Sequence, residues 1–163
     1  EPFDLIVTTN GGYPLDQNLY QAVKGMSAAH QIASEGGTIV CAAECSDGLP
    51  EHGNFKDLFK LRESPRELLQ MIEEPGFAVF DQWEVQKLAL IQLHARVHLY
   101  SELPDEDAEL ANLTPIQDLQ SHIDSLVEGL GPDARIAALP WGPFTIPYVR
   151  VRAPRRMAVT ASE

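Results

Sequence analysis

The sequence is poor in cysteine, in basic residues and in long apolar runs. Its 163 residues include 2 cysteines, and 12 Lys and Arg stand against 24 Asp and Glu, so the net charge is −12. Two cysteines are too few for a disulfide framework or a four-cysteine zinc site, which favours a reducing, cytoplasmic compartment. The negative charge argues against nucleic acid as a partner, and no apolar run approaches the roughly 18 residues that a membrane span needs.

The composition is otherwise that of one folded domain, with 44% hydrophobic and 22% charged residues. We expect a single domain over residues 1–150, followed by a basic tail over residues 151–163. The clustered basic residues near this boundary are Arg150, Arg152, Arg155 and Arg156. The chain begins at Glu1 without an initiator Met, and this start predicts a piece of a longer polypeptide.

Apolar runs separated by turn residues predict alternating strands and helices. Strands are expected at residues 5–9, 38–43, 97–100 and 134–139. Helices are expected at residues 16–34, 55–61, 64–74, 81–95 and 114–130, and residues 103–110 are expected to form a short helix or a loop. This alternation predicts an α/β fold with three αβα layers and a mostly parallel, Rossmann-like sheet.

Local signals set the predicted ends of these helices. Asp16 is expected to cap the first helix and Gly36-Gly37 to end it, while Asp81 and Glu84 are spaced as in a capping box. Thr114-Pro115 is expected to open the last helix, whose core stripe would be Ile116, Leu119, Ile123, Leu126, Val127 and Leu130. The apolar residues of helix 81–95 point all round its axis, which predicts burial on more than one side.

The loop after the first strand, Thr8 to Asp16, occupies the position where parallel sheets bind ligands. Its glycines Gly11 and Gly12 permit close approach of the backbone to a ligand. It has neither the spacing of a dinucleotide fingerprint nor that of a phosphate-binding P-loop. A tight strand-to-helix turn explains the same residues, so the loop alone leaves both interpretations open.

The helix that follows presents a polar face. At about 100° per residue, Tyr20, Gln21 and Lys24 share one side, opposite a core stripe of Leu19, Ala22, Val23, Met26, Ala29 and Ala33. An ammonium beside an amide, close to a helix N-terminus, suits a small carboxylate or a developing oxyanion. A solvated helix face is the alternative interpretation.

Four other features are weaker candidates. His94 and His98 are spaced like metal ligands on a helix, but they straddle its predicted end, so we expect no metal site. Cys45 could act as a nucleophile only with a nearby base such as His52. The segment Glu44 to Asp47 is either a ligand-contacting loop or a turn. Trp83 is either a core aromatic or a residue at the rim of a site.

The segment TTNGGYPLDQNLYQAVKGM, residues 8–26, closely resembles the C-terminal domain of the nickel-dependent lactate racemase family. The segments GGTIV at residues 36–40 and AECSDG at residues 43–48 resemble the next strand and loop of that family. Residues 81–83 resemble it more loosely, and the last third of the chain is supported only by the fold pattern.

The resemblance implies a C-terminal domain that supplies substrate-binding residues to an active site between two domains. Gln21 and Lys24 match substrate-contacting positions, Tyr20 lies beside them in the motif, and Trp83 matches an aromatic residue near the cofactor. The implied cofactor is a nickel pincer nucleotide, held mainly by an N-terminal domain that also supplies the acid–base histidines. The implied reaction inverts C2 of a 2-hydroxy acid by hydride transfer through a 2-keto acid, with Lys24 stabilising charge on the oxygens.

A second function class fits the same residues. The chain could be a non-catalytic α/β module that binds a small carboxylate or a partner domain. Nickel content and turnover of 2-hydroxy acids would separate the two functions. In both cases the partners are expected to be the N-terminal domain of the same polypeptide and a small acid, with neither nucleic acid nor membrane.

Overall fold

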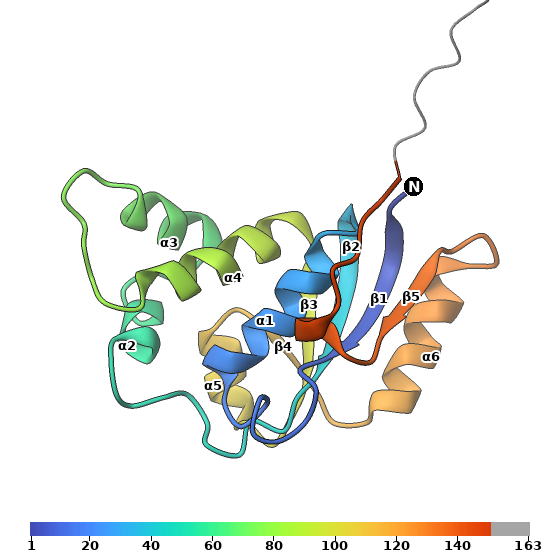
Figure 1. Ribbon diagram of the computed structural model, residues 1–163, viewed down its shortest axis with the longest axis horizontal. Coiled ribbons are helices and arrows are strands. Elements are labelled where there is room, and N and C mark those ends of the chain that lie inside the picture. The colour runs from blue at the N-terminus through green and yellow to red at the C-terminus, as the bar shows by residue number, and fades with distance from the viewer. Residues whose placement is uncertain (151–163) are drawn as a thin grey trace, which may run out of the picture.

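A computed structural model describes residues 1–150, and these build a five-stranded sheet in which every neighbouring pair is parallel. The strands are β1 (Phe3–Thr9), β2 (Ala33–Ala42), β3 (Arg96–Tyr100), β4 (Thr114–Ile116) and β5 (Ile136–Leu139). Their order across the sheet is β4-β3-β2-β1-β5 (Figure 1). Strand β1 therefore lies inside the sheet, between β2 and β5, and the loop that follows it opens at the carboxyl edge.

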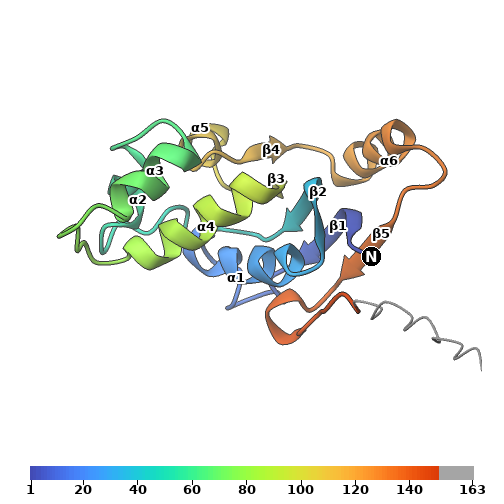
Figure 2. The same ribbon diagram turned by 90° about the horizontal axis from the view of Figure 1, so that it is seen from above.

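Helices cover both faces of the sheet, which confirms the predicted three layers. The helices are α1 (Leu19–His30), α2 (Phe55–Phe59), α3 (Pro65–Ile72), α4 (Gln82–His94), α5 (Asp105–Leu110) and α6 (Leu119–Leu130), with a 3-10 turn η1 (Gly142–Phe144). Helices α1 and α4 lie on one face and α6 lies on the other (Figure 2). None of these helices is both long and apolar enough to cross a membrane.

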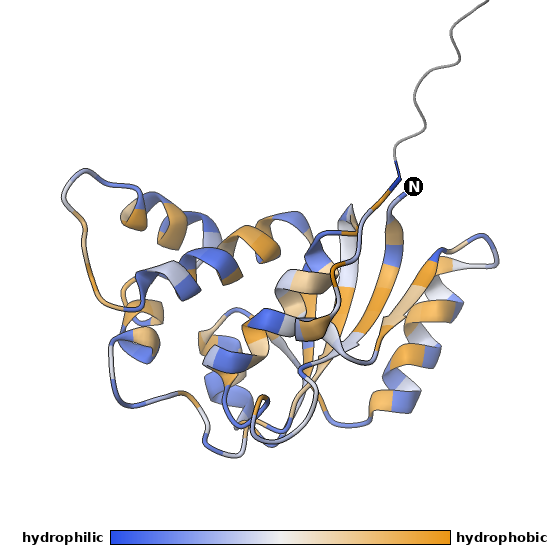
Figure 3. Cartoon of the chain, in the orientation of Figure 1, coloured by the Kyte–Doolittle hydropathy of each residue, from blue (hydrophilic) through white to orange (hydrophobic). Residues whose placement is uncertain are grey.

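The residues of β1 contribute to two separate apolar clusters, one on each face of the sheet, because successive strand residues point to opposite faces. Ile6 packs in the large cluster with the predicted core stripe of α1. The stripe residues from Leu19 to Ala29 are buried on this helix, whereas Ala33 is the first residue of β2. Leu5 packs in a smaller cluster with Val40 and Ile116, against α6. Figure 3 shows the apolar residues concentrated on the strands and on the helix sides that face them.

The first helix is shorter than predicted at both ends. Asn18, not Asp16, is the N-cap, and its side-chain oxygen accepts a hydrogen bond from Gln21 N at 3.0 Å. The helix ends at His30, and Gly36-Gly37 lies inside β2, where the register with β1 is shifted. The glycines therefore mark an irregularity in a strand and not the end of the helix.

One further helix start was wrong, and one predicted capping box is absent although the helix begins where expected, after Asp81. Thr114-Pro115 forms the edge strand β4, where a proline costs no ladder hydrogen bond, and α6 begins later under an Asp118 cap. Asp81 has φ 71° and makes no capping bond, because its Oδ2 accepts a hydrogen bond from Asn54 N at 3.0 Å. Its side chain holds the preceding loop instead of the helix.

Burial of the outer helices is also lower than predicted. No residue of α6 is fully buried, and Val127 and Leu130 are exposed. On α4, Leu90 and Leu93 are exposed, although the helix packs against α1, α3 and the sheet as predicted. A short strand on the edge of the sheet covers less of α6 than a full-length strand would.

Candidate functional site

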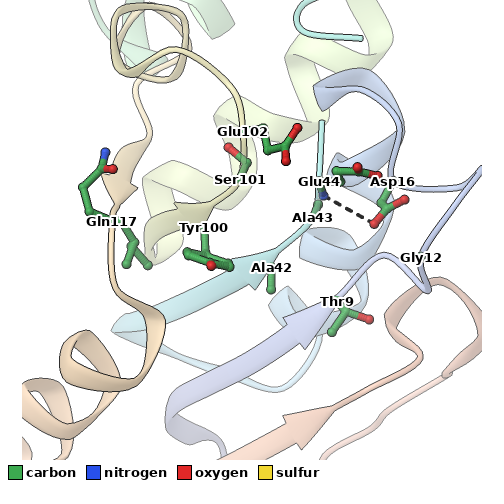
Figure 4. A pocket seen from close by; sticks show the side chains of 11 residues that line it. Thr9, Gly12, Asp16, Ala42, Ala43, Glu44, Tyr100, Ser101, Glu102 and Gln117 are labelled. Carbon is green, nitrogen blue, oxygen red and sulfur yellow. Dashed lines mark hydrogen bonds between the residues drawn. The ribbon is translucent and has the colours of Figure 1, made fainter. Parts of the chain in front are cut away.

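The larger cavity described here lies at the carboxyl ends of four strands and has a volume of about 550 Å³ (Figure 4). The loop after β1 contributes Thr9, Gly12 and Asp16 to its wall. The other lining residues follow the neighbouring strands, namely Ala42, Ala43, Glu44, Tyr100, Ser101, Glu102, Ile116 and Gln117. This is the edge at which open parallel sheets bind their ligands.

The loops after β1 and β2 are tied together at this cavity, and the sequence had singled out both. Glu44 N donates to Asp16 Oδ2 at 3.3 Å, and Cys45 N donates to Asp16 O at 2.8 Å. Among the described residues that line the cavity, three carry carboxylates and none is basic. The sequence did not single out Tyr100 or Gln117, because nothing local marks a residue that reaches the cavity from a later strand.

The polar face of α1 lies beside this edge and carries the three residues predicted to share it. Lys24 is exposed, and its ammonium donates a hydrogen bond to Gln21 Oε1. Gln21 is half-buried, and its backbone is fixed twice, since its N–H reaches the Asn18 cap and its carbonyl accepts from Asn10 Nδ2 at 3.0 Å. The helix therefore presents Gln21 and Lys24 as a joined pair near its N-terminus.

Trp83 lies at a rim and not in the core, with 43% of its surface exposed. Its indole Nε1 donates a hydrogen bond to the Tyr20 hydroxyl at 3.1 Å, which joins the starts of α4 and α1. The Tyr20 ring also packs edge-on against Phe55, with centroids 5.2 Å apart. Because the Tyr20 oxygen accepts from Trp83, its own hydrogen is available to a ligand.

A second cavity, of about 250 Å³, opens next to these residues. Tyr20 and Gln21 line it, together with Asn18, Pro50, His52, Phe80 and Asp81. Gln21 thus faces this smaller cavity and does not line the larger one, and Lys24 lines neither. Phe80 was not singled out from the sequence, because it reaches the site only through the packing of α4 against α1.

The histidines do not form the metal pair whose spacing was considered. His94 Nε2 lies 3.0 Å from the carbonyl of Ala33, whereas His98 Nδ1 lies 2.6 Å from His122 Nε2 on α6. Within residues 1–150, no group of three or more His, Cys, Asp or Glu side chains could hold a metal ion.

Cys45 is poorly suited to act as a nucleophile. It is buried, and burial together with the nearby Asp16 and Glu44 carboxylates raises its thiol pKa to about 12. The neighbouring thiol of Cys41 is also buried, and burial raises its pKa as well. A thiol protonated at neutral pH is a weak nucleophile.

The pair of His98 and His122 predicts that the stability of the fold depends on pH. Burial, His122 and Arg96 lower the pKa of His98 to about 4, whereas an unfolded histidine titrates near about 6.5. The unfolded state therefore binds the proton first, and the free energy of unfolding should fall as the pH drops from about 6.5 to about 4. We expect His98 to account for about 1 kcal/mol of this loss, well below full linkage, because the ring is only half-buried.

Urea unfolding at neutral and acid pH checks this expectation, with His98→Gln as the matched variant. His30, whose pKa is lowered by burial and by His94, contributes in the same direction and remains in both proteins. The carboxyls of Asp4 and Asp118 have pKa values lowered by hydrogen bonds, so they lose their stabilising effect only at more acid pH. An equal pH-dependent loss in both proteins would rule out the pair as its source.

Three comparisons with known proteins point to the same family. Residues 1–146 match the family model of the lactate racemase C-terminal domain. The chain is 36% identical to the lactate racemase of Thermoanaerobacterium thermosaccharolyticum, over 87% of this chain and 34% of that protein. It is 39% identical to the lactate racemase of Lactiplantibacillus plantarum, over 85% of this chain and 33% of that protein.

The fold agrees as well. The solved structure of the lactate racemase apoprotein from Thermoanaerobacterium thermosaccharolyticum superimposes with a TM-score of 0.78 at 36% identity, covering 87% of this chain and 34% of that one. The chain thus spans about a third of the length of the curated relatives it matches. On the family match, the sequence identity and the shared fold, the chain belongs to the family of lactate racemase C-terminal domains.

Proposed function

We propose that residues 1–150 are the C-terminal domain of a longer, two-domain 2-hydroxy-acid racemase and form one wall of its active site. The observation that carries this proposal is the joined Gln21–Lys24 pair at the open N-terminal face of α1, in a chain of this family. The partner in the same polypeptide would be the N-terminal domain, which closes the other side of the site. The buried, unpaired thiols of Cys41 and Cys45 support a reducing, cytoplasmic setting.

Each residue of this face has a distinct task in the proposed reaction. The Lys24 ammonium stabilises negative charge on the oxygens of the 2-hydroxy acid and of the 2-keto acid formed from it. The Gln21 amide, whose backbone is held by Asn10 and Asn18, orients the substrate. The Tyr20 hydroxyl is held by Trp83 and donates its hydrogen toward the bound acid.

The family resemblance implies a nickel pincer nucleotide, and the residues here fit contact with its organic part. Residues 1–150 offer no cluster of metal-binding side chains, so the nickel would be held by the N-terminal domain. The exposed rings of Trp83 and Phe80 pack edge to face at 5.2 Å and form an apolar rim suited to a flat ring system. When bound, the cofactor supplies a reversible acceptor for the hydrogen at C2.

The test of this proposal is racemisation by the complete polypeptide loaded with its cofactor. Starting from one enantiomer of lactate or a related 2-hydroxy acid, we expect progress toward an equal mixture, measured with enantiomer-specific dehydrogenases, and nickel in the purified protein. A nickel-loaded protein that turns over no 2-hydroxy acid would contradict the proposal. That result would favour the non-catalytic module that binds a carboxylate or a partner domain.

A further inference from the structure

The smaller cavity beside α1 has no task in the chemistry at C2 described above. Gln21 and Tyr20 form one side of it, and Pro50, His52 and Phe80 form the other. A substrate whose reacting carbon lies against Gln21 would therefore have its C2 substituent at the mouth of this cavity. Its walls are the part of this chain best placed to distinguish one 2-hydroxy acid from another.

The outer wall of the cavity is held in place by specific contacts. The buried Asp81 carboxylate accepts a hydrogen bond from Asn54 N at 3.0 Å, which joins loop 50–54 to the start of α4. Gly53 has φ +82°, and a Cβ at this position would collide with Asp81 Oδ2. The loop that carries His52 thus has little freedom to collapse into the cavity.

The chemistry of the walls favours a neutral, apolar occupant. The rings of Tyr20, Phe80 and Pro50 supply apolar surface, while the side-chain oxygen of Asn18 is already used by the helix cap. Asp81 places a carboxylate in the wall, and none of the lining residues is Lys or Arg. A second carboxylate on the substrate would meet repulsion from Asp81, with no Lys or Arg in the wall to offset it.

The size of the cavity also bears on the substrate. A volume of about 250 Å³ is several times that of a methyl group, which takes up about as much room as one water molecule, roughly 30 Å³. The methyl group of lactate would leave most of the cavity unfilled. A branched aliphatic or aromatic substituent would fill it and remove apolar surface from water.

Building on the proposed function, we propose that this cavity receives the C2 substituent of the substrate. It selects 2-hydroxy acids with a neutral branched aliphatic or aromatic side chain over lactate; Phe80 is its specificity-determining residue, and His52 lies at its mouth. His52 is exposed at the mouth, and Phe80 is 65% exposed beside Trp83. Both can be replaced without opening the core.

The experiment compares kcat/KM of the cofactor-loaded complete polypeptide for lactate, 2-hydroxy-4-methylpentanoate, 3-phenyllactate and malate. Since one methylene in an apolar pocket is worth about 10-fold or more, we expect the two larger neutral acids to exceed lactate by at least about fivefold and malate to fall below them. His52→Trp, which fills the mouth, should lower kcat/KM for both larger acids by about tenfold and leave lactate within about twofold.

Three variants accompany it. Phe80→Ala should lower kcat/KM for 3-phenyllactate by about fivefold, since an exposed ring contributes less than a buried one. His52→Ala controls for loss of the imidazole and should leave the order of substrates unchanged. Phe144→Ala removes a ring of similar exposure, 67%, that does not line the cavity, and it should change no ratio.

The outcomes separate this inference from the proposed function. Racemisation of lactate in preference to both larger acids, or an equal effect of His52→Trp on every substrate, would overturn the inference and leave the racemase proposal standing. If no 2-hydroxy acid is racemised, the proposed function fails. Calorimetric titration of 2-hydroxy-4-methylpentanoate then tests the inference. If the acid binds to the unaltered protein and not to His52→Trp, the inference is supported. If the acid does not bind to the unaltered protein, the inference is refuted.

Discussion

Replacing Lys24 with alanine in the complete polypeptide should lower the racemisation kcat/KM at least about tenfold, which corresponds to about 1.4 kcal/mol of lost transition-state stabilisation. The chain carries a net charge of −12, so its overall field does not attract an acid anion. In the proposed site, the Lys24 ammonium instead attracts the anion by its local position. Lys24 is exposed in the second turn of α1, where its contact with Gln21 orients the ammonium.

The control for this variant is Lys60→Ala, which removes an exposed lysine at the end of α2 that is paired with the exposed Asp57 at 2.7 Å. It should leave kcat/KM within about twofold, since an exposed ion pair contributes little. Lys24→Arg keeps the charge but not the shape of the cation, so we expect it to recover part of the rate. Full activity of Lys24→Ala, measured by the same enantiomer-specific assay, would remove Lys24 from the proposed machinery.

The pattern of hydrophobic residues predicted the strands and helices of each layer well, because the burial of each element determines which of its residues are apolar. The run at residues 5–9 lies within β1, and the stripe from Leu19 to Ala29 is buried along α1. A short, continuous apolar run is typical of a strand in a parallel sheet that helices cover on both faces. The strand order depends on contacts between distant segments, which the pattern does not contain.

The errors arose where a local signal competed with tertiary contacts. Asp16 has the chemistry of a helix cap, but its carboxylate bonds to Glu44 N across two loops, and Asn18 caps the helix instead. Thr114-Pro115 has the form of a helix start, yet it pairs with β3 at the edge of the sheet. A cap contributes only about 1 kcal/mol, so pairing and loop contacts can override it.

The candidate site could be predicted only where it lies on one helix. The helical period predicted the common face of Tyr20, Gln21 and Lys24, because three residues within two turns need no tertiary information. The bond between Trp83 and Tyr20 joins residues 63 positions apart. The cavity walled by Phe80 likewise exists only once α4 has packed beside α1.

The second large effect is expected at Gly25, on the side of α1 that faces β1. A Cβ at this position would lie 2.6 Å from the carbonyl oxygen of Thr9 and 3.2 Å from Asn10 Oδ1. Both are held in place, since Thr9 ends an interior strand and Asn10 Oδ1 accepts a hydrogen bond from Gly25 N at 2.9 Å. Gly25→Ala should therefore destabilise the fold by about 2 to 3 kcal/mol, as overpacking of a rigid core does.

The matched control for Gly25→Ala is Gly129→Ala on α6, where an added Cβ meets nothing within 4 Å. There alanine should stabilise by about 0.5 to 1 kcal/mol, since it lowers the entropy of the unfolded chain. The urea midpoints of the two variants compare their free energies of unfolding. Equal stability of the two would contradict the prediction, since it would show that α1 and the loop after β1 move apart at little cost. Where the added Cβ is accommodated by a shift of α1, the helix that carries Gln21 and Lys24 is displaced, so the activity of the complete polypeptide should fall even at temperatures where the variant remains folded.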